Sequence, residues 1–446
     1  MITEEFDLPN EFSRYEKFIK EDFDRFYPVF KKYEEMGNTF FQSFVNASDD
    51  LANSHNISES SRLVYTQIAM TGYFLLSQYS KVLTFPISDE DFESVYFRLK
   101  SAVIGGERAI VSALLASALA LLADLKKTSP SVYRVFYVIM SLEMAAMNSD
   151  VESILKYAKR FRNMLFDSVL IQDYPLLTMQ VVSDLAYRES RTGDSSYERW
   201  LEIYKELAEA LNMETKRLDC YTMLGGRYRF SGYLEESMEY YNKAISIAER
   251  VGNKEYMANL ISNMADLEHT RGNLEKALKL CQDALRDPEI CESKPSLYIN
   301  ISEVLIKKEE YHSAVEYLEK ANELTENNSP IVNLLYGFTL TKLSDKRSFN
   351  EGIKFLEKGG VLSEKSKNQR YIAAYHFLMG RVYLDIYDLS SAINSFEKCY
   401  SIALISEFQY ALLSQLFLAE SYLHRYKISQ NDYDLTKSEK YLANVI

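Results

Sequence analysis

A repeated pattern of small residues, with a period of 40 residues, constrains this chain more than any other feature. The stretches 221–250 and 261–285 align when Gly225 is matched to Ala265. Each stretch then carries a glycine seven residues on and further small residues twelve and nineteen residues on; these are Gly232 and Gly272, Ser237 and Ala277, and Ala244 and Ala284. Such a period predicts a solenoid, because one helical hairpin cannot bury its apolar face alone and has to stack on a copy of itself.

The same pattern extends to both sides of these two stretches. The positions that match Ser237 in successive units are Trp200, Ser237, Ala277, Ala314, Gly352, Ala392 and, less regularly, Ser438. Small side chains let two helix axes approach to about 8–10 Å, so we expect the two helices of each unit to cross at these positions. Trp200 replaces the small residue in its unit, so the two helices there are expected to be splayed apart. With only 15 Gly and 8 Pro in 446 residues, turns are too few for a chain of strands, and long helices are predicted.

This pattern resembles the tetratricopeptide repeat. The clearest part runs from Tyr221 to Leu324, and the resemblance covers roughly residues 131–446. It implies an all-α fold, a right-handed α-α superhelix of paired antiparallel helices, with seven or eight hairpins over residues 129–446. Residues 1–128 are expected to form an N-terminal helical region, either a bundle or degenerate repeats. Proteins of this family bind other proteins, so the resemblance implies a scaffold or adaptor rather than an enzyme.

Asparagines on the first helices of the units are the most specific candidate binding residues. Asn263 and Asn300 each stand two residues before the matched small residue of their unit, and Asn259 lies one turn before Asn263 on the same helix face. A carboxamide both donates and accepts hydrogen bonds, so it can clamp a peptide backbone. The resemblance implies that first helices line a concave groove and that asparagine at this position holds an extended peptide. A solvated polar face is the alternative explanation.

Charged residues occupy neighbouring positions of the expected groove. Asp219, Asp266 and Glu303 are acidic, and Arg229 lies further along. This local acidity favours a peptide with basic residues and would speed its encounter at low salt. We therefore predict a protein or peptide partner that binds in the groove as an extended segment or a helix.

Other classes of function find little support in the sequence. The net charge is −13, without the concentrated basic face that binds nucleic acid. There is no nucleotide-binding glycine loop, HExxH motif or nucleophile elbow, and none of the 5 histidines is paired with another at ligand spacing. The 4 cysteines include no CxxC pair. We expect no catalytic residues, no cofactor, no metal and no direct contact with nucleic acid.

Neither export nor a membrane is predicted. The N-terminus is acidic and lacks the charged-then-apolar pattern of a signal peptide. The most apolar run, residues 109–123, is about 15 residues long and too short to span a bilayer. A cytoplasmic protein is expected.

Two alternatives to a simple scaffold stay open. Residues 12–30 carry an apolar stripe that fits one face of an amphipathic helix, formed by Phe12, Tyr15, Ile19, Phe23, Phe26 and Phe30. On the first alternative, the N-terminal region is an effector that responds to peptide binding. On the second, the apolar C-terminal helix, with Tyr441, Leu442, Val445 and Ile446, joins the chain into a homo-oligomer or makes it a subunit of a larger assembly.

Overall fold

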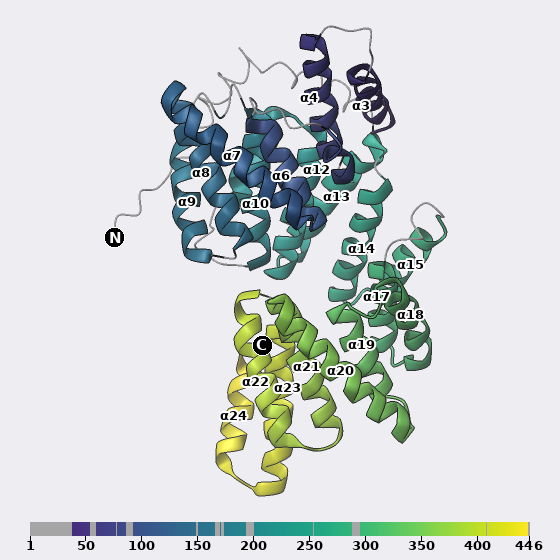
Figure 1. Ribbon diagram of the computed structural model, residues 1–446. Helices are drawn as coiled ribbons and strands as arrows, with labels where there is room; N and C mark the ends of the chain where they lie inside the picture. Colours follow the sequence, from purple (N-terminus) through teal and green to yellow (C-terminus); the bar gives the residue numbers. More distant parts are fainter. Residues whose placement is uncertain are drawn as a thin grey trace. The chain divides into compact units, whose positions relative to one another are not determined.

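The structure is a computed structural model of the chain. It describes residues 38–444 apart from 54–58, 77, 86–91, 149, 166–169, 171–173, 193–199, 253, 288–294 and 407. This described part forms 21 helices and contains no strand (Figure 1). The prediction of an all-α fold is confirmed.

Five helices come first. They are α3 (Asn38–Ala52), α4 (Glu59–Leu75), α5 (Tyr79–Val82), α6 (Phe92–Gly105) and α7 (Arg108–Thr128). Aromatic side chains join α4 to α6, with the ring centroids of Phe74 and Phe97 4.5 Å apart. The stripe predicted in residues 12–30 lies outside the described residues.

From residue 130 onward the helices follow one another in pairs. The pairs are α8 (Pro130–Met147) with α9 (Val151–Met164), α10 (Pro175–Thr192) with α11 (Trp200–Leu211), α12 (Glu214–Phe230) with α13 (Leu234–Val251), α14 (Lys254–Thr270) with α15 (Leu274–Leu285), α17 (Pro295–Lys307) with α18 (Tyr311–Leu324), α19 (Pro330–Thr341) with α20 (Lys346–Ser366), α21 (Gln369–Asp385) with α22 (Leu389–Ser406), and α23 (Phe408–Ser429) with α24 (Asp432–Ala443). The earlier member of a pair is its first helix and the later member its second helix. Helices α6 and α7 form such a pair as well.

The turns between paired helices account for the repeated glycine. Gly232 and Gly272 have φ angles of 84° and 85°, a left-handed conformation that glycine adopts without steric cost. In both pairs the second helix begins two residues later. Glu309 occupies the same place before α18 with a φ of 62°. The turn geometry therefore repeats even where the glycine does not.

Small residues lie where paired helices cross, as the sequence predicts. Ser237 on α13 is fully buried, and its hydroxyl donates a hydrogen bond to the carbonyl of Gly225 on α12 at 2.7 Å. A Cβ atom on Gly225 would lie 2.5 Å from the ring of Tyr241. Buried apolar side chains such as Leu356 and Phe396 fill the space beside the later crossings. Buried apolar side chains are thus found at successive helix pairs along the chain, and not in a single central core.

The chain divides into two compact units. Unit 1 comprises residues 1–189, 195–220 and 249–252, and unit 2 comprises residues 190–194, 221–248 and 253–446. Helix α12 passes from one unit to the other between Cys220 and Tyr221. The boundary predicted at residues 128 and 129 falls inside unit 1, between α7 and α8.

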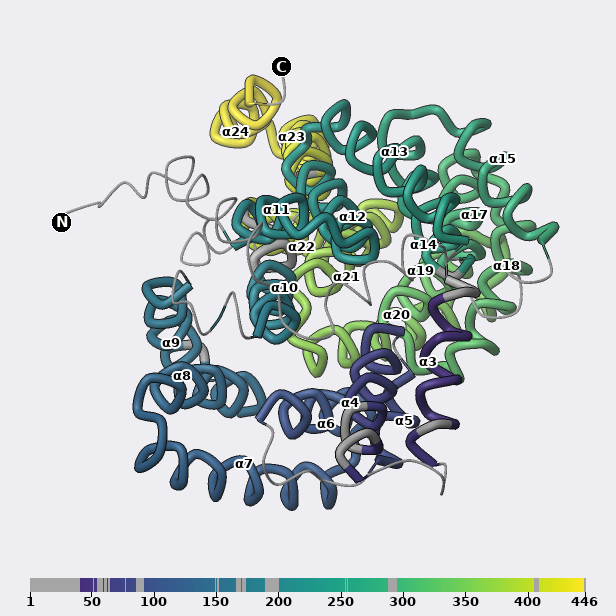
Figure 2. The backbone as a smooth tube through the Cα atoms, turned by 90° about the horizontal axis from the view of Figure 1, so that it is seen from above, coloured from purple at the N-terminus to yellow at the C-terminus, as the bar shows by residue number. Residues whose placement is uncertain are grey.

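Helix α7 is longer than its apolar run suggests. It has 21 residues and is, in the described part of the chain, the helix long and apolar enough to cross a membrane. The expectation that this region is too short was wrong, because the helix includes the polar residues at both ends of the run. Length and composition alone do not place it in a membrane. Within unit 1, α7 packs on α6 and α8 and lies outside them (Figure 2).

Candidate binding face on the first helices

Polar side chains follow one face of α14 in unit 2. Asn259, Asn263 and Asp266 are spaced four and three residues apart, which places them on the same side of a helix. Asn259 is exposed and Asn263 is half-buried. Neither carboxamide has a hydrogen-bond partner among the described residues. The hydrogen-bonding groups of both carboxamides are therefore unused within the described part of the chain.

Asn300 does not match Asn263 in its surroundings. It is only 8% exposed, and its Nδ2 donates to the carbonyl oxygen of Ser262 at 2.6 Å and to the Ser262 hydroxyl at 3.0 Å. These bonds fix α17 to α14. The prediction that the two asparagines form equivalent rungs of a ladder is therefore corrected: Asn300 holds neighbouring helices together, and its amide donors are already used.

Asp266, three residues after Asn263 on α14, is the centre of an ion-pair cluster. The Asp266 carboxylate is 3.1 Å from the Arg229 guanidinium of α12 and 3.6 Å from the Arg370 guanidinium of α21. Both guanidinium groups also lie near the ring of Phe230, at 4.3 and 5.1 Å from its centroid. Burial by itself would raise the pKa of Asp266, but the two positive charges outweigh it and hold the pKa below its ordinary value. Asp266 is thus ionised and fixed in place.

His269 adds a buried atom without a partner to this cluster. Its Nε2 has no hydrogen-bond partner among the described residues, although it is inaccessible to solvent. Burial lowers the pKa of His269 to about 4, and Asp266 opposes this only in part. The imidazole is therefore neutral at neutral pH. Nearly all buried polar atoms in folded proteins are hydrogen-bonded, so this ring has capacity for one more bond.

Asp266 and His269, together with Glu303 of α17, form a group of side chains that can be tested as a metal site. The ligating atoms of Asp266, His269 and Glu303 lie within 4.8 Å of one another. However, Arg229 and Arg370 already neutralise Asp266, and the positive charge of Lys307 also acts on His269. A divalent cation at this place would face three positive groups and two carboxylates. The donor set therefore fits a hydrogen-bonding ligand better than a metal ion.

The remaining predicted acidic residues also have partners. Asp219, in unit 1, accepts hydrogen bonds from Tyr204 at 2.9 Å and from Ser183 at 3.2 Å. Glu303 interacts with a further residue as well. The structure therefore brings Arg229, Asp266 and Glu303 together on unit 2, whereas Asp219 belongs to unit 1. The acidity expected to attract a basic peptide is largely compensated by the chain itself.

Sequence reasoning missed two members of the cluster. Arg370 stands 104 residues after Asp266 (370 − 266), and no repeat spacing connects them. His269 had a detectable signal, because it lies one turn after Asp266 on the same helix. The repeat also places Glu303 where Asp266 stands in the preceding unit.

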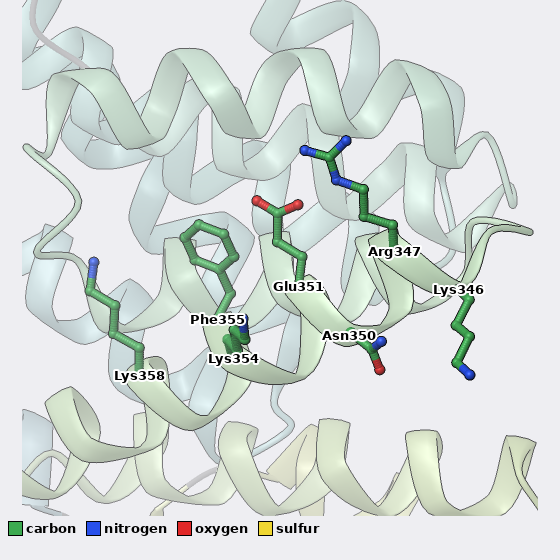
Figure 3. A pocket seen from close by; sticks show the side chains of 7 residues that line it. All are labelled: Lys346, Arg347, Asn350, Glu351, Lys354, Phe355 and Lys358. Carbon is green, nitrogen blue, oxygen red and sulfur yellow. The ribbon is translucent and has the colours of Figure 1, made fainter.

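A second surface feature lies on α20. A hollow of about 890 Å³ is lined by Lys346, Arg347, Asn350, Glu351, Lys354, Phe355 and Lys358. Figure 3 shows these seven side chains along the helix. Four of these side chains are basic and one is acidic, in a chain with a net charge of −13. The hollow is open to solvent and lies on a second helix. It is electrostatically opposite to the acidic groove that the sequence predicts.

An array of helix pairs with polar first-helix faces defines a helical-repeat protein. Comparison with known families identifies the repeat: residues 218–250, 295–328 and 373–404 match the tetratricopeptide repeat. These segments coincide with the pairs α12 and α13, α17 and α18, and α21 and α22. The chain carries tetratricopeptide repeats at these positions, so the resemblance inferred from the sequence is confirmed.

Several solved structures have a similar fold. The apo form of the quorum sensor NprR from B. thuringiensis is 15% identical, with 81% of this chain and 98% of that chain covered and a TM-score of 0.50. Aspartyl phosphate phosphatase F from Bacillus subtilis is 14% identical, with 87% and 95% covered and a TM-score of 0.44. The Cut9–Hcn1 hetero-tetramer of APC/C is 12% identical, with 85% and 81% covered and a TM-score of 0.45. These likenesses concern the fold alone. Among curated proteins, no sequence matches this chain.

Proposed function

We propose that this chain is a protein-interaction scaffold that binds an extended peptide on the first-helix face of unit 2. The tetratricopeptide repeats support the general role, because such repeats form a binding scaffold that typically has no catalytic activity. The assignment to α14 and its neighbours is finer and depends on the side chains of that face.

Unused hydrogen-bonding capacity beside fixed charges is the observation that carries this proposal. In the described part of the chain, Asn259 and Asn263 have no hydrogen-bond partner, and Nε2 of His269 is buried without one. Arg229 and Arg370 hold the neighbouring Asp266 in position. A peptide backbone offers both amide donors and carbonyl acceptors, so it complements the two carboxamides.

A basic side chain of a peptide can pair with Asp266 only if it displaces one of the two arginines that already contact this carboxylate. Arg229 is buried and 3.1 Å from Asp266, whereas the Arg370 side chain is 38% exposed and 3.6 Å away. A ligand arginine or lysine would therefore replace Arg370 rather than Arg229. Because this exchange leaves the number of ion pairs unchanged, backbone hydrogen bonds supply most of the binding free energy.

A peptide library tests the proposal. Random peptides would be selected on the wild-type full chain, and the affinity of the best would be measured by fluorescence anisotropy for Asn263→Ala and for Asn242→Ala. Asn242 is an exposed asparagine on the second helix α13 and serves as the matched control. Loss of one or two backbone hydrogen bonds should weaken binding to Asn263→Ala by roughly tenfold. Equal affinity of both variants would contradict the assigned face.

A peptide-responsive regulator is the second candidate. The apolar stripe of residues 12–30 motivates it, and the fold is shared with a quorum sensor over most of that chain. It requires the N-terminal region to change position on binding. Small-angle scattering of the full chain, free and saturated with the selected peptide, distinguishes the two: an unchanged curve favours the scaffold and excludes the regulator.

A further inference from the structure

The outer face of α7 is apolar and open to solvent. From Arg108 to Asp124 the exposed residues are Arg108, Ala109, Ser112, Ala113, Ala116, Leu119, Ala120, Ala123 and Asp124, and the last turn adds the exposed Lys126, Lys127 and Thr128. Only Leu114, Ala118 and Leu122 of this helix are buried, and Leu119 is 51% exposed. The second helix α9 differs, because its exposed residues are Glu152, Lys156, Lys159, Arg160 and Asn163. A solvated helix face would be expected to look like α9.

Between Arg108 and Asp124 the exposed residues are symmetric about Ala116. At equal distances on its two sides stand Arg108 and Asp124, Ala109 and Ala123, Ser112 and Ala120, and Ala113 and Leu119. A second α7, running antiparallel with a two-fold axis through Ala116, therefore places small residues opposite small residues over most of the contact. It also places Arg108 of each copy opposite Asp124 of the other.

We propose that α7 is the contact between two copies of this chain, packed antiparallel about Ala116. Alanine and serine at the centre allow the two helix axes to approach to about 8 Å. The half-buried Val111, Leu115 and Leu121 lie beside this line and would close its edges. The contact is isologous, so each copy supplies the same residues to it.

Charge complementarity selects a second copy running antiparallel over other occupants. In the part of the chain that the structure describes, neither Arg108 nor Asp124 has an ion-pair partner, so both are free to pair across the two-fold axis. A parallel arrangement would bring Arg108 against Arg108 and Asp124 against Asp124, which costs free energy. An anionic lipid surface would attract Lys126 and Lys127 of the last turn but repel Asp124, whereas a second antiparallel copy pairs both Arg108 and Asp124.

The size of the contact sets its expected strength. From Arg108 to Asp124 the helix is about 25 Å long, so a single helix pair lies at the small end of stable interfaces, below about 1,200 Å² of buried area in total. A reversible dimer that dissociates on dilution is therefore expected, rather than a permanent one. Dimerisation would give the assembly two peptide-binding faces and so allow bivalent binding.

Sedimentation equilibrium of the full chain tests the proposal through a charge swap. Arg108→Asp and Asp124→Arg each place like charges opposite at both ends and should weaken the dimer by roughly tenfold or more. The double variant Arg108→Asp/Asp124→Arg restores opposite charges at both ends and should dimerise like the wild type. Ala116→Arg at the axis should abolish the dimer, and Lys156→Glu on α9 is the control that should leave it intact. Circular dichroism would confirm that each variant folds.

Three results would overturn the proposal. The first is a chain that stays monomeric at every concentration, whether or not it binds vesicles that contain anionic phospholipid. The second is a dimer that none of the α7 variants weakens, which would move the contact to another surface such as the C-terminal helix. The third is a double variant as weak as the single ones, because recovery is the result that requires Arg108 and Asp124 to face each other.

Discussion

Gly337 on α19 and Gly352 on α20 lie backbone against backbone where these two helices cross. A Cβ atom on Gly337 would lie 2.6 Å from the carbonyl oxygen of Gly352, and a Cβ atom on Gly352 would lie 2.5 Å from the carbonyl oxygen of Gly337. Side-chain carbon atoms do not approach oxygen so closely. This pair of helices therefore depends on the absence of a side chain at both positions, which is the packing rule that defines the whole repeat.

Replacing Gly352 by alanine should destabilise unit 2. The added methyl group has to push α20 away from α19, and overpacking of this kind costs about 1–3 kcal/mol. Urea unfolding followed by circular dichroism would measure the loss. An unchanged unfolding midpoint would show that the two helices are not in contact here.

Adjacent glycines on α12 should respond in opposite directions. At Gly225 a Cβ atom would lie 2.5 Å from the buried ring of Tyr241, so Gly225→Ala should destabilise the fold by about 1–3 kcal/mol. At Gly226 the nearest atom is 3.7 Å away, so Gly226→Ala should raise stability by about 0.5–1 kcal/mol through helix propensity. Thermal unfolding of both variants provides the comparison. The same sign of change in both would contradict the position of Tyr241.

Replacing Asn300 by alanine should lower the stability of the fold, whereas replacing Asn263 should not. Asn300→Ala removes two hydrogen bonds to Ser262 and leaves a buried carbonyl without this donor, so a loss of about 1–3 kcal/mol is expected. Asn263→Ala removes no bond to a described residue and should leave the unfolding midpoint within about 0.5 kcal/mol of the wild type. Urea unfolding measures both. Equal losses would mean that the two asparagines are equivalent, against the observed burial.

His269 should make stability depend on pH. Burial lowers its pKa to about 4 from an ordinary value of 6.5, so the unfolded chain binds a proton at a higher pH than the folded chain. This contribution is complete above pH 6.5 and is lost as the pH falls from 6.5 towards 4. Urea unfolding at several pH values should therefore show a shallower acid loss for His269→Gln than for the wild type. Parallel curves would mean that the imidazole titrates normally.

Local packing could be read from the sequence because it repeats. The spacing of Gly225, Gly232 and Ser237 recurs 40 residues on, and each of these residues has the same physical task in each unit, at a crossing or in a turn. A residue at a helix crossing has to be small, and a residue in the turn has to adopt a left-handed backbone conformation, so both roles restrict the residue type. Fold class and helix pairing follow from it directly.

The polar first-helix face of unit 2 could be predicted only in part. Asn263 and Asn300 have the same spacing from their matched small residues, yet Asn300 is buried against Ser262, because spacing along the chain does not report which side chains of a neighbouring helix a residue contacts. Arg370 reaches Asp266 across intervening pairs, and a contact between distant repeats leaves no periodic signal. The charge of the face was therefore misjudged, since the compensating arginine could not be located from the sequence.

Hydrogen–deuterium exchange of the full chain, free and saturated with the library-selected peptide, tests the central proposal most directly. If the peptide lies on the first-helix face of unit 2, exchange should slow in α14 (Lys254–Thr270) and in the part of α12 (Glu214–Phe230) that carries Arg229. The second helices α13 and α15 should be unaffected. Protection confined to α20, with its basic hollow, or to the second helices would contradict the proposal and place binding on a different surface.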